Sequence, residues 1–328
     1  MAQGDSKKEA LFNEVKGSLF EYLVGLEIAK RSGDELTFQK SLDPNYLTVL
    51  AQQDRMVRQF YPEMSGFLSQ VSKLTTDGLQ SHLGKNLTRP RLLGKFINSS
   101  LGSVIREADL AVDSDGKERL VSLKLNKKNA YVNTKSGGIK SFFTQYFPFV
   151  DPKVQEEFNV LVEMEFETMA RELHSFHDIS WPGNFSAWVK KGLSELPGEL
   201  SEGERAILKK YYARIARDMH RILTLLEKSN PMEFRSNLAA LMGFGQEVVQ
   251  VICFHDMKAD GEPYLHIHEL SSHELGSAKL LPFENVSSVE LDVGGDYLQI
   301  RVKPMNKFTT TAIKINCSVK FKRPSGGE

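Results

Sequence analysis

An aspartate and a lysine lie on two short strand-like segments that a turn sequence separates. Residues 106–112 carry Asp109, and residues 120–125 carry Lys124. The Asp113-Ser114-Asp115-Gly116 segment between them has the residues of a tight turn, so the region predicts a β-hairpin. Carboxylate oxygen binds magnesium, and a lysine beside such a metal stabilises the negative charge that develops on a phosphate. The two residues therefore suit metal-assisted hydrolysis of a phosphodiester.

Residue spacing sets which side chains share a face of this hairpin. Side chains two residues apart on a strand point the same way, so Glu107 joins Asp109, and Ser122 joins Lys124. The second segment is apolar except at Ser122 and Lys124, and a lysine within an apolar strand is costly unless it has a partner. An exposed hairpin with ordinary surface charges is the other interpretation, and the sequence leaves it open.

Helical segments flank the hairpin. Before it, apolar residues recur at spacings of three and four over residues 9–29. This pattern predicts an amphipathic helix that ends near Ser32-Gly33 and carries Glu21 on its second face. After the hairpin, the Thr134–Gly138 cluster predicts a break in the chain, and residues 139–146 follow as a short aromatic helix.

This order of elements resembles the core of the PD-(D/E)XK nuclease superfamily, which has the restriction-endonuclease-like fold. In that family an acid on a helix is followed by a metal-binding aspartate on one strand, an acid-x-lysine element on the next strand, and another helix. The matching positions here are Glu21, Asp109 and Ser122-Leu123-Lys124. The family usually has glutamate or aspartate where this chain has Ser122, and a serine hydroxyl is a poor substitute for an anionic ligand.

The resemblance implies roles for these residues. A magnesium ion, with manganese as a substitute, would be held by Asp109 and by the backbone carbonyl of Leu123. The charge that the serine lacks would come from Glu21 or Glu107, and the sequence does not decide between them. The implied catalytic residues are Asp109, Ser122, Lys124 and Glu21.

Local charge around the hairpin points to a polyanionic substrate. Seven lysines and arginines lie between residues 117 and 140, against a single acid, Glu118. A second basic stretch spans residues 301–323 and contains no acid, so we expect the two stretches to line one cleft. A solvated basic loop is the plainer interpretation. The residues that we expect to contact nucleic acid are Asn126, Lys127, Lys128, Asn129, Asn133, Lys135, Lys140, Lys303 and Lys307.

Together with the resemblance, these features predict a magnesium-dependent DNA endonuclease. Restriction-like, sequence-specific cutting is the favoured subtype, and RNA is left open as a substrate. Such enzymes often dimerise to cut both strands, so a homodimer is compatible with this function. The main alternative is a non-catalytic nucleic-acid-binding or assembly protein that uses the same basic hairpin. A further alternative is a His-liganded metalloenzyme, based on His266 and His268 with His273 downstream.

Overall composition limits the partners and the setting. The chain has 328 residues, with 42 Lys+Arg and 42 Asp+Glu, so any case for nucleic acid must rest on local charge. Cys253 and Cys317 lie in apolar segments, which favours reduced thiols over a disulfide. The polar first residues and the absence of a long apolar run in the sequence predict a cytoplasmic protein without a membrane partner.

Periodicity divides the chain into three stretches of different character. We expect an α+β or mixed α/β protein with a restriction-endonuclease-like core in residues 1–150, including a helical insertion at about 45–85. A helical region follows over residues 151–245. Residues 246–328 are β-rich, and the sequence leaves them as a separate region or as part of the same domain.

Overall fold

The computed structural model describes residues 2–93, 108–242, 248–255, 262–268, 278–304 and 307–321. Its chain divides into two compact units. Unit 1 contains residues 1–130 and 244–270, and unit 2 contains residues 131–243 and 271–328. Each unit has helices and one β-sheet, so the protein is of the mixed α+β class, as the sequence predicts.

Helices make up the first part of unit 1, and their ends follow local sequence signals. The first helix stops where Gly33 adopts a positive φ of 77°, a conformation that glycine adopts without strain. The third is capped by Asp43, whose side chain accepts hydrogen bonds from the backbone N–H of Asn45 and Tyr46. The helices are α1 (Ala2–Ser32), α2 (Glu35–Ser41), α3 (Pro44–Phe60) and α4 (Pro62–Leu83).

A five-stranded mixed sheet, sheet A, forms the rest of unit 1. Its strand order is β1-β2-β3-β5-β6. Strands β1, β2 and β3 form an antiparallel meander, β5 runs parallel to β3, and β6 returns antiparallel to β5. A parallel pair needs a crossover connection, and here the chain between β3 and β5 passes through unit 2. The strands are β1 (Leu87–Leu92), β2 (Leu110–Ser114), β3 (Lys117–Lys127), β5 (Val248–His255) and β6 (Tyr264–His268).

The predicted hairpin is formed by β2 and β3. Ser114 pairs with Lys117, and the two residues between them, Asp115 and Gly116, have φ angles of 50° and 77°. Two positive φ angles in a two-residue loop define a type I′ turn, which suits the twist of the flanking strands. The Asp-Gly sequence therefore fixes the register of the hairpin.

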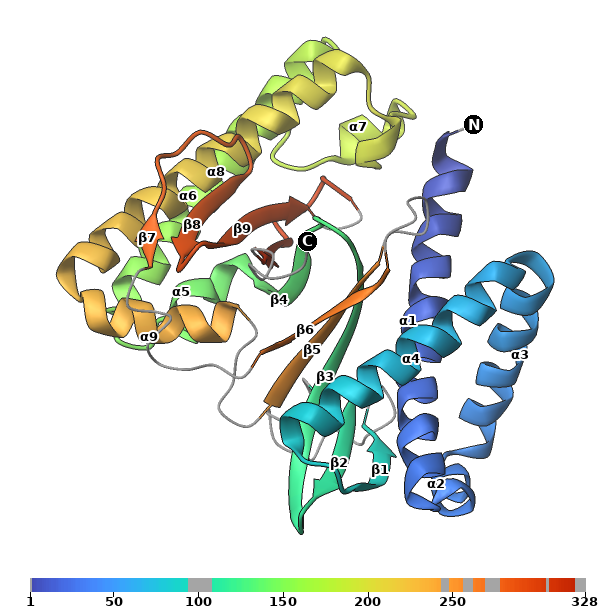
Figure 1. Ribbon diagram of the computed structural model, residues 1–328. Helices are drawn as coiled ribbons and strands as arrows, with labels where there is room; N and C mark the ends of the chain where they lie inside the picture. Colours follow the sequence, from blue (N-terminus) through green and yellow to red (C-terminus); the bar gives the residue numbers. More distant parts are fainter. Residues whose placement is uncertain are drawn as a thin grey trace. The chain divides into compact units, whose positions relative to one another are not determined.

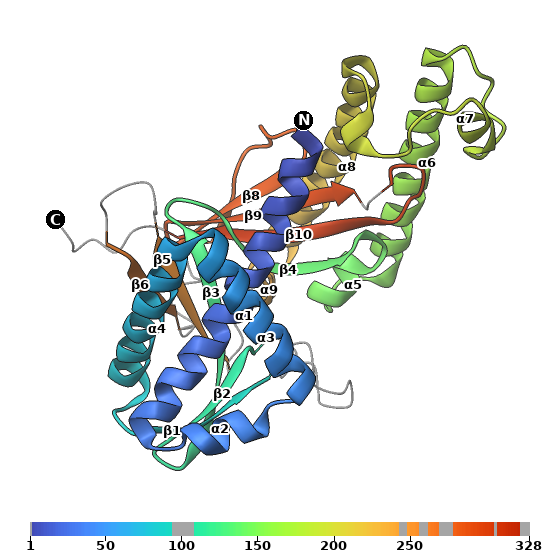
Figure 2. The ribbon, with the colours of Figure 1, turned by 90° about the vertical axis from the view of Figure 1, so that its right-hand side faces the viewer.

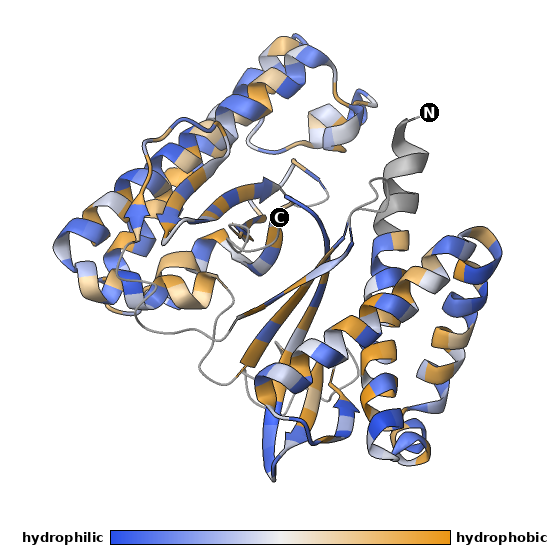
Figure 3. Ribbon diagram, in the orientation of Figure 1, coloured by the Kyte–Doolittle hydropathy of each residue, from blue (hydrophilic) through white to orange (hydrophobic). Residues whose placement is uncertain are grey.

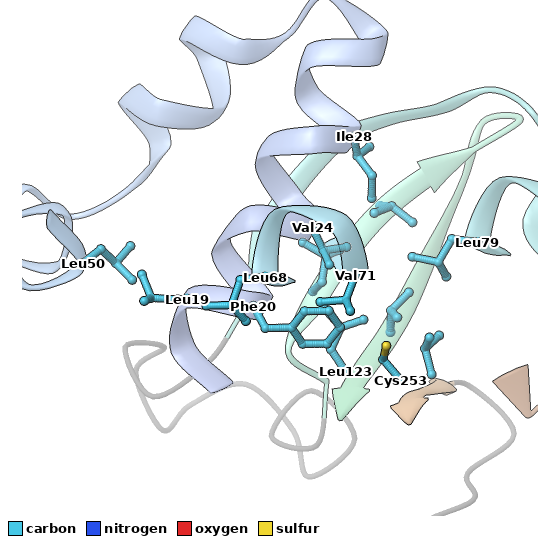
Figure 4. Close-up of a cluster of buried hydrophobic side chains, with 14 of the residues drawn as sticks. Leu19, Phe20, Val24, Ile28, Leu50, Leu68, Val71, Leu79, Leu123 and Cys253 are labelled. Carbon is cyan, nitrogen blue, oxygen red and sulfur yellow. The ribbon is translucent and has the colours of Figure 1, made fainter. Parts of the chain in front are cut away.

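Apolar side chains from the helices cover one face of sheet A. Val121 and Leu123 of β3 lie in a cluster with Phe20 and Val24 of α1 and Val71 of α4 (Figure 4). Figure 1 shows α1 and α4 lying along the strands. Because side chains alternate along a strand, Ser122 and Lys124 are on the opposite face.

Unit 2 is built on a second sheet, sheet B, whose strands are all antiparallel. Its strand order is β4-β10-β9-β8-β7. Figure 2 shows β8, β9, β10 and β4. The strands are β4 (Val132–Gly138), β7 (Lys279–Leu280), β8 (Ser288–Val293), β9 (Asp296–Pro304) and β10 (Ile313–Lys320).

The two long helices of unit 2, α6 (Pro152–Phe176) and α8 (Glu202–Ser229), pack against each other. Helix α8 also contacts strands β8 and β9. Figure 3 shows the alternating hydropathy of α6 and α8, which is typical of helices with one buried face. The helices of this unit are η2 (Ile139–Ser141), α5 (Phe142–Tyr146), α6 (Pro152–Phe176), α7 (Ser186–Lys190), η3 (Pro197–Glu199), α8 (Glu202–Ser229) and α9 (Pro231–Leu241).

Two local expectations differ from the structure. The Thr134–Gly138 cluster forms most of strand β4 instead of a break, because β10 supplies it with a hydrogen-bonding partner, as in the pair of Gly137 and Ile315. The short aromatic helix that follows belongs to unit 2 and not to the unit that contains the hairpin. Its side chains are core residues: Phe142 and Phe143 are fully buried.

The two units also divide the chain differently from the three expected stretches. Strands β5 and β6 belong to unit 1, whereas β7 to β10 share unit 2 with the helical region. The β-rich C-terminal stretch is therefore split between two sheets. The physical reason is the pairing of β5 with β3, which is remote in sequence and has no local signal.

Both cysteines are buried free thiols, as predicted. Burial raises the pKa of Cys253 to about 12 and that of Cys317 to about 12, so both stay protonated at neutral pH. Within the described part of the chain, no helix combines the length and the apolar character needed to cross a bilayer.

Candidate functional site

Asp109 accepts three hydrogen bonds on a single carboxylate oxygen, Oδ2. The donors are the Ser122 hydroxyl at 3.2 Å, the Leu123 backbone N–H at 2.7 Å and the Lys124 ammonium at 3.2 Å. All three come from consecutive residues of β3. The structure therefore brings together the aspartate and the Ser-x-Lys element that the sequence singled out.

The backbone around Asp109 explains how its carboxylate reaches β3. The Asp109 N–H donates to the Val121 carbonyl at 2.9 Å, although Val121 is the register partner of Leu110. Two residues thus oppose one, which is the arrangement of a β-bulge. On its other side, the Asp109 carbonyl accepts from the Leu93 N–H at 2.9 Å. The bulge directs the aspartate side chain to the N–H of Leu123, where a regular ladder would place a backbone acceptor.

The Leu123 carbonyl lies on the same edge of β3 as its N–H, since both groups of a strand residue leave on one side. That edge faces Asp109, because the Leu123 N–H donates to the carboxylate. The Leu123 carbonyl is therefore on the side of β3 from which the Leu123 N–H reaches the Asp109 carboxylate. Oxygen ligands of this kind suit a hard divalent cation.

The ion pair in this site is partly withdrawn from water. The side chain of Asp109 is 18% exposed and that of Lys124 is 34% exposed, whereas Ser122 is buried. Screening by water is weaker here than at the surface, so each charge depends on the other more strongly than in an exposed pair.

Sequence reasoning missed Gln250. Ser122 is the register partner of Gln250 on β5, and Gln250 is in turn the partner of His268 on β6. Paired residues on neighbouring strands share a face, so Gln250 lies on the same face of sheet A as Ser122. It is 2% exposed, and its Oε1 has no hydrogen-bond partner among the described residues. The signal was available, because Gln250 is the one polar residue within the apolar run 248–254.

Glu21, the acid expected on the first helix, lies on α1. It is half-buried, and Gly25, one helical turn later, packs against Leu110 of β2. Burial, with a smaller effect from the Glu21 charge, raises the pKa of Tyr46 to about 12. Glu21 is therefore within electrostatic range of Tyr46 on α3, and its helix covers the face of sheet A opposite to that of Ser122 and Lys124. Glu107, the other expected acid, lies outside the described residues.

The histidines of the alternative metal site lie on β6. His266 pairs with Ile252, so it shares the sheet face of Lys124, the register partner of Ile252 on β3. His273 and Glu269 are outside the described residues. Among the side chains that the structure describes, no three His, Cys, Asp or Glu groups gather as a metal site would require.

The expected nucleic-acid contacts at the end of β3 belong to unit 1. Lys128 places its ammonium 5.8 Å from the centre of the Tyr264 ring, and its backbone N–H donates to His255. Asn126 donates to the Ala130 carbonyl at 3.2 Å, and Asn129 has a positive φ of 62°. Both asparagines therefore shape the turn after β3, a role that asparagine fills well. Lys127 lies at the exposed end of the strand.

The remaining expected contacts lie in unit 2, and most are engaged within it. Lys140 forms an ion pair with Glu163, and Lys307 pairs with Glu195 at 2.8 Å. Asn133 accepts a hydrogen bond from Ser318 at 2.7 Å. Burial lowers the pKa of Lys135, although the nearby Cys317 opposes the shift. Lys303 is exposed on β9.

Comparisons with known proteins add no family to this description. No protein-family model matches the chain, and no curated protein and no solved structure matches it significantly.

Proposed function

We propose that the protein is a magnesium-dependent DNA endonuclease and that unit 1 carries the reaction. The observation that carries this proposal is the convergence of Ser122, Leu123 and Lys124 on the carboxylate of Asp109. This arrangement places a carboxylate, which can bind a metal ion, beside the Lys124 ammonium, which can stabilise charge on a phosphate. Helix α1 with Glu21 precedes these strands in the order that the nuclease resemblance implies.

The chemistry of the donor set fits magnesium. Asp109 and the Leu123 carbonyl supply hard oxygen atoms, and magnesium is commonly held by only one or two carboxylates together with waters and substrate phosphates. Glu21 or Glu107 would supply a second carboxylate. When bound, the ion would stabilise charge on the phosphate and lower the pKa of a coordinated water.

The protein groups have separable roles in this proposal. The Leu123 N–H and the Ser122 hydroxyl fix the orientation of the Asp109 carboxylate, because both donate to one oxygen and leave the other outside these bonds. Lys124 supplies a positive charge where negative charge develops on the phosphate. Its bond to Asp109 keeps the ammonium in place before the substrate arrives.

Restriction-like, sequence-specific cutting is the subtype that we propose. The hairpin and α1 account for the chemistry, and the rest of the chain, including the whole of unit 2, is available for recognition. A homodimer would let two such sites cut both strands. Lys127, Lys128 and Lys303 are the candidates for contacts to phosphate: Lys127 and Lys303 are exposed, and Lys128 lies directly after β3.

One observation favours a second candidate function, a nucleic-acid-binding or assembly protein without metal chemistry. Asp109 and Lys124 already neutralise each other, and Ser122 stands where an anionic ligand is usual. Such a pair is also found as a purely structural element of a sheet. This candidate predicts binding that is independent of magnesium.

A substrate panel tests the proposal. Supercoiled, linear double-stranded and single-stranded DNA, and RNA, are incubated with the full chain in magnesium, in manganese and in EDTA. We expect cleavage of DNA that requires the metal, and the cut ends are mapped to determine whether they share a sequence. Binding without cleavage under every metal condition would favour the second candidate.

A further inference from the structure

We propose that Gln250 is a neutral oxygen ligand of the metal site and takes the place of the usual second acid. This inference rests on the proposed function, because it assigns an additional ligand to the same site. It starts from Gln250 of β5, the one polar residue within the apolar run from Val248 to Phe254 of that strand.

The first step concerns the cost of burying this residue. Gln250 is 2% exposed, and its Oε1 has no hydrogen-bond partner within the described part of the protein. A buried polar oxygen without a partner destabilises the folded state, and a hydrophobic residue of similar volume would avoid this cost. A buried polar atom of this kind is explained where a water or an ion satisfies it.

The second step concerns its direction. Val249 and Val251 belong to the cluster beneath α1 and α4, so Gln250 is on the other face of sheet A. On that face its neighbour across β3 is Ser122, whose hydroxyl lies 3.2 Å from the Asp109 carboxylate. Gln250 is thus the register partner of Ser122, and Ser122 is hydrogen-bonded to Asp109.

The third step concerns the length of the side chains. The hydroxyl of serine is attached directly to Cβ, whereas glutamine carries its amide at the end of a longer chain. A glutamate at position 122 would bring its own carboxylate to this face of β3, and a serine does not. The Gln250 side chain is on the same face of the next strand and is long enough to extend its amide along that face, and an amide oxygen is a hard ligand of the kind that magnesium accepts.

The consequence is a site with less negative charge than one in which residue 122 also supplies a carboxylate. Replacing a carboxylate with an amide weakens metal binding, because one negative charge no longer contributes to it. We therefore expect the affinity for metal to increase in Gln250→Glu and to decrease in Gln250→Met. The Met variant keeps the volume of the side chain but has no hard oxygen.

Metal binding without substrate is the direct test. Calorimetry with magnesium and paramagnetic resonance with manganese are performed on the full-length wild type, Gln250→Met, Gln250→Glu and Asp109→Asn. The control is Gln299→Met, the same change on β9 of unit 2, where the Gln299 amide donates to Glu290 at 3.1 Å. Thermal unfolding in EDTA is recorded for each variant.

We expect Gln250→Met to bind manganese about ten-fold or more weakly, with a thermal midpoint in EDTA that is unchanged or higher. Gln250→Glu should bind more tightly and Gln299→Met as the wild type does. If Gln250→Met does not fold, a Gln250→Glu variant that binds no more tightly than wild type overturns the inference. If Asp109→Asn loses metal but Gln250→Met keeps it, the inference is wrong and the proposed function survives. A wild type that binds no metal overturns both.

Discussion

The ammonium of Lys124 lies 3.2 Å from the Oδ2 atom of Asp109, and the two residues come from opposite sides of one hairpin. The β-bulge at Asp109 and the alternation of side chains on β3 together produce this contact. It explains how a lysine is tolerated within the largely apolar segment 120–125 of β3. It also holds a cation and a carboxylate side by side, which is the arrangement that the proposed reaction needs.

Lys124 is expected to act on the reaction more than on the fold. Lys124→Met keeps the aliphatic stem and removes the charge, so cleavage should slow by about 100-fold or more while the protein remains folded. The matched control is Lys117→Met, an exposed lysine at the other end of the same strand. Single-turnover cleavage rates and circular dichroism distinguish the two variants, and equal rates in them would exclude a catalytic role for Lys124.

Ser122 should matter less than the residue it contacts. Its hydroxyl donates one of three bonds to Asp109, so Ser122→Ala leaves the Leu123 N–H and Lys124 in place. We expect a reduction of activity several-fold smaller than that in Asp109→Asn. Magnesium titrations of the cleavage rate compare the two variants. A larger loss in Ser122→Ala would show that the hydroxyl does more than orient the carboxylate.

Glu21 is tested by its effect on the metal requirement. If its carboxylate supplies the second charge, Glu21→Gln should raise the magnesium concentration needed for half-maximal cleavage, because a charged ligand is replaced by a neutral one. Glu14→Gln serves as the control on the exposed part of the same helix. An identical magnesium dependence in both variants would leave Glu107 as the acid to examine.

The hairpin and the helices were predictable because their signals are local. The Asp115-Gly116 turn determines the hairpin register, and Asp43 and Gly33 mark helix ends. The pairing of β5 with β3 could not be predicted, because more than one hundred residues separate the two strands. Neither segment alone indicates the register that pairs Gln250 with Ser122. For the same reason Thr134–Gly138, with the residues of a break, becomes a strand only because β10 pairs with it.

Binding to DNA should depend on salt through the exposed lysines. Each phosphate that a lysine no longer neutralises should decrease the slope of log affinity against log salt by about 0.9, so Lys127→Ala with Lys128→Ala should lower it by about 1.8. In unit 2, Lys303→Ala should have a larger effect than Lys307→Ala, because Lys307 is paired with Glu195. Lys209→Ala with Lys210→Ala is the control for exposed lysines elsewhere. Affinities in calcium at several salt concentrations provide the slopes, and a slope unchanged by every variant would exclude these phosphate-binding roles.

Acid should weaken unit 2 through Glu204. Burial raises the pKa of this carboxyl, but hydrogen bonds from Ser201 and His177 outweigh burial and hold the pKa below its ordinary value. A lowered pKa contributes stability that is present at neutral pH and is lost as the pH falls below about 4. Glu204→Gln should therefore lower the thermal midpoint at pH 7 and have less effect at pH 3. An equal effect at both values would contradict the assigned shift.

The cleavage rate of Asp109→Asn tests the central claim most directly. Wild type, Asp109→Asn and Asp113→Asn are compared on the same DNA in magnesium. Asp113 is on the neighbouring part of the hairpin, near Arg89, so it undergoes the same loss of charge away from the site. We predict that Asp113→Asn cuts at the wild-type rate, whereas Asp109→Asn cuts at least about 100-fold more slowly and still binds DNA in calcium. A folded Asp109→Asn protein that cuts DNA as fast as the wild type would contradict the account.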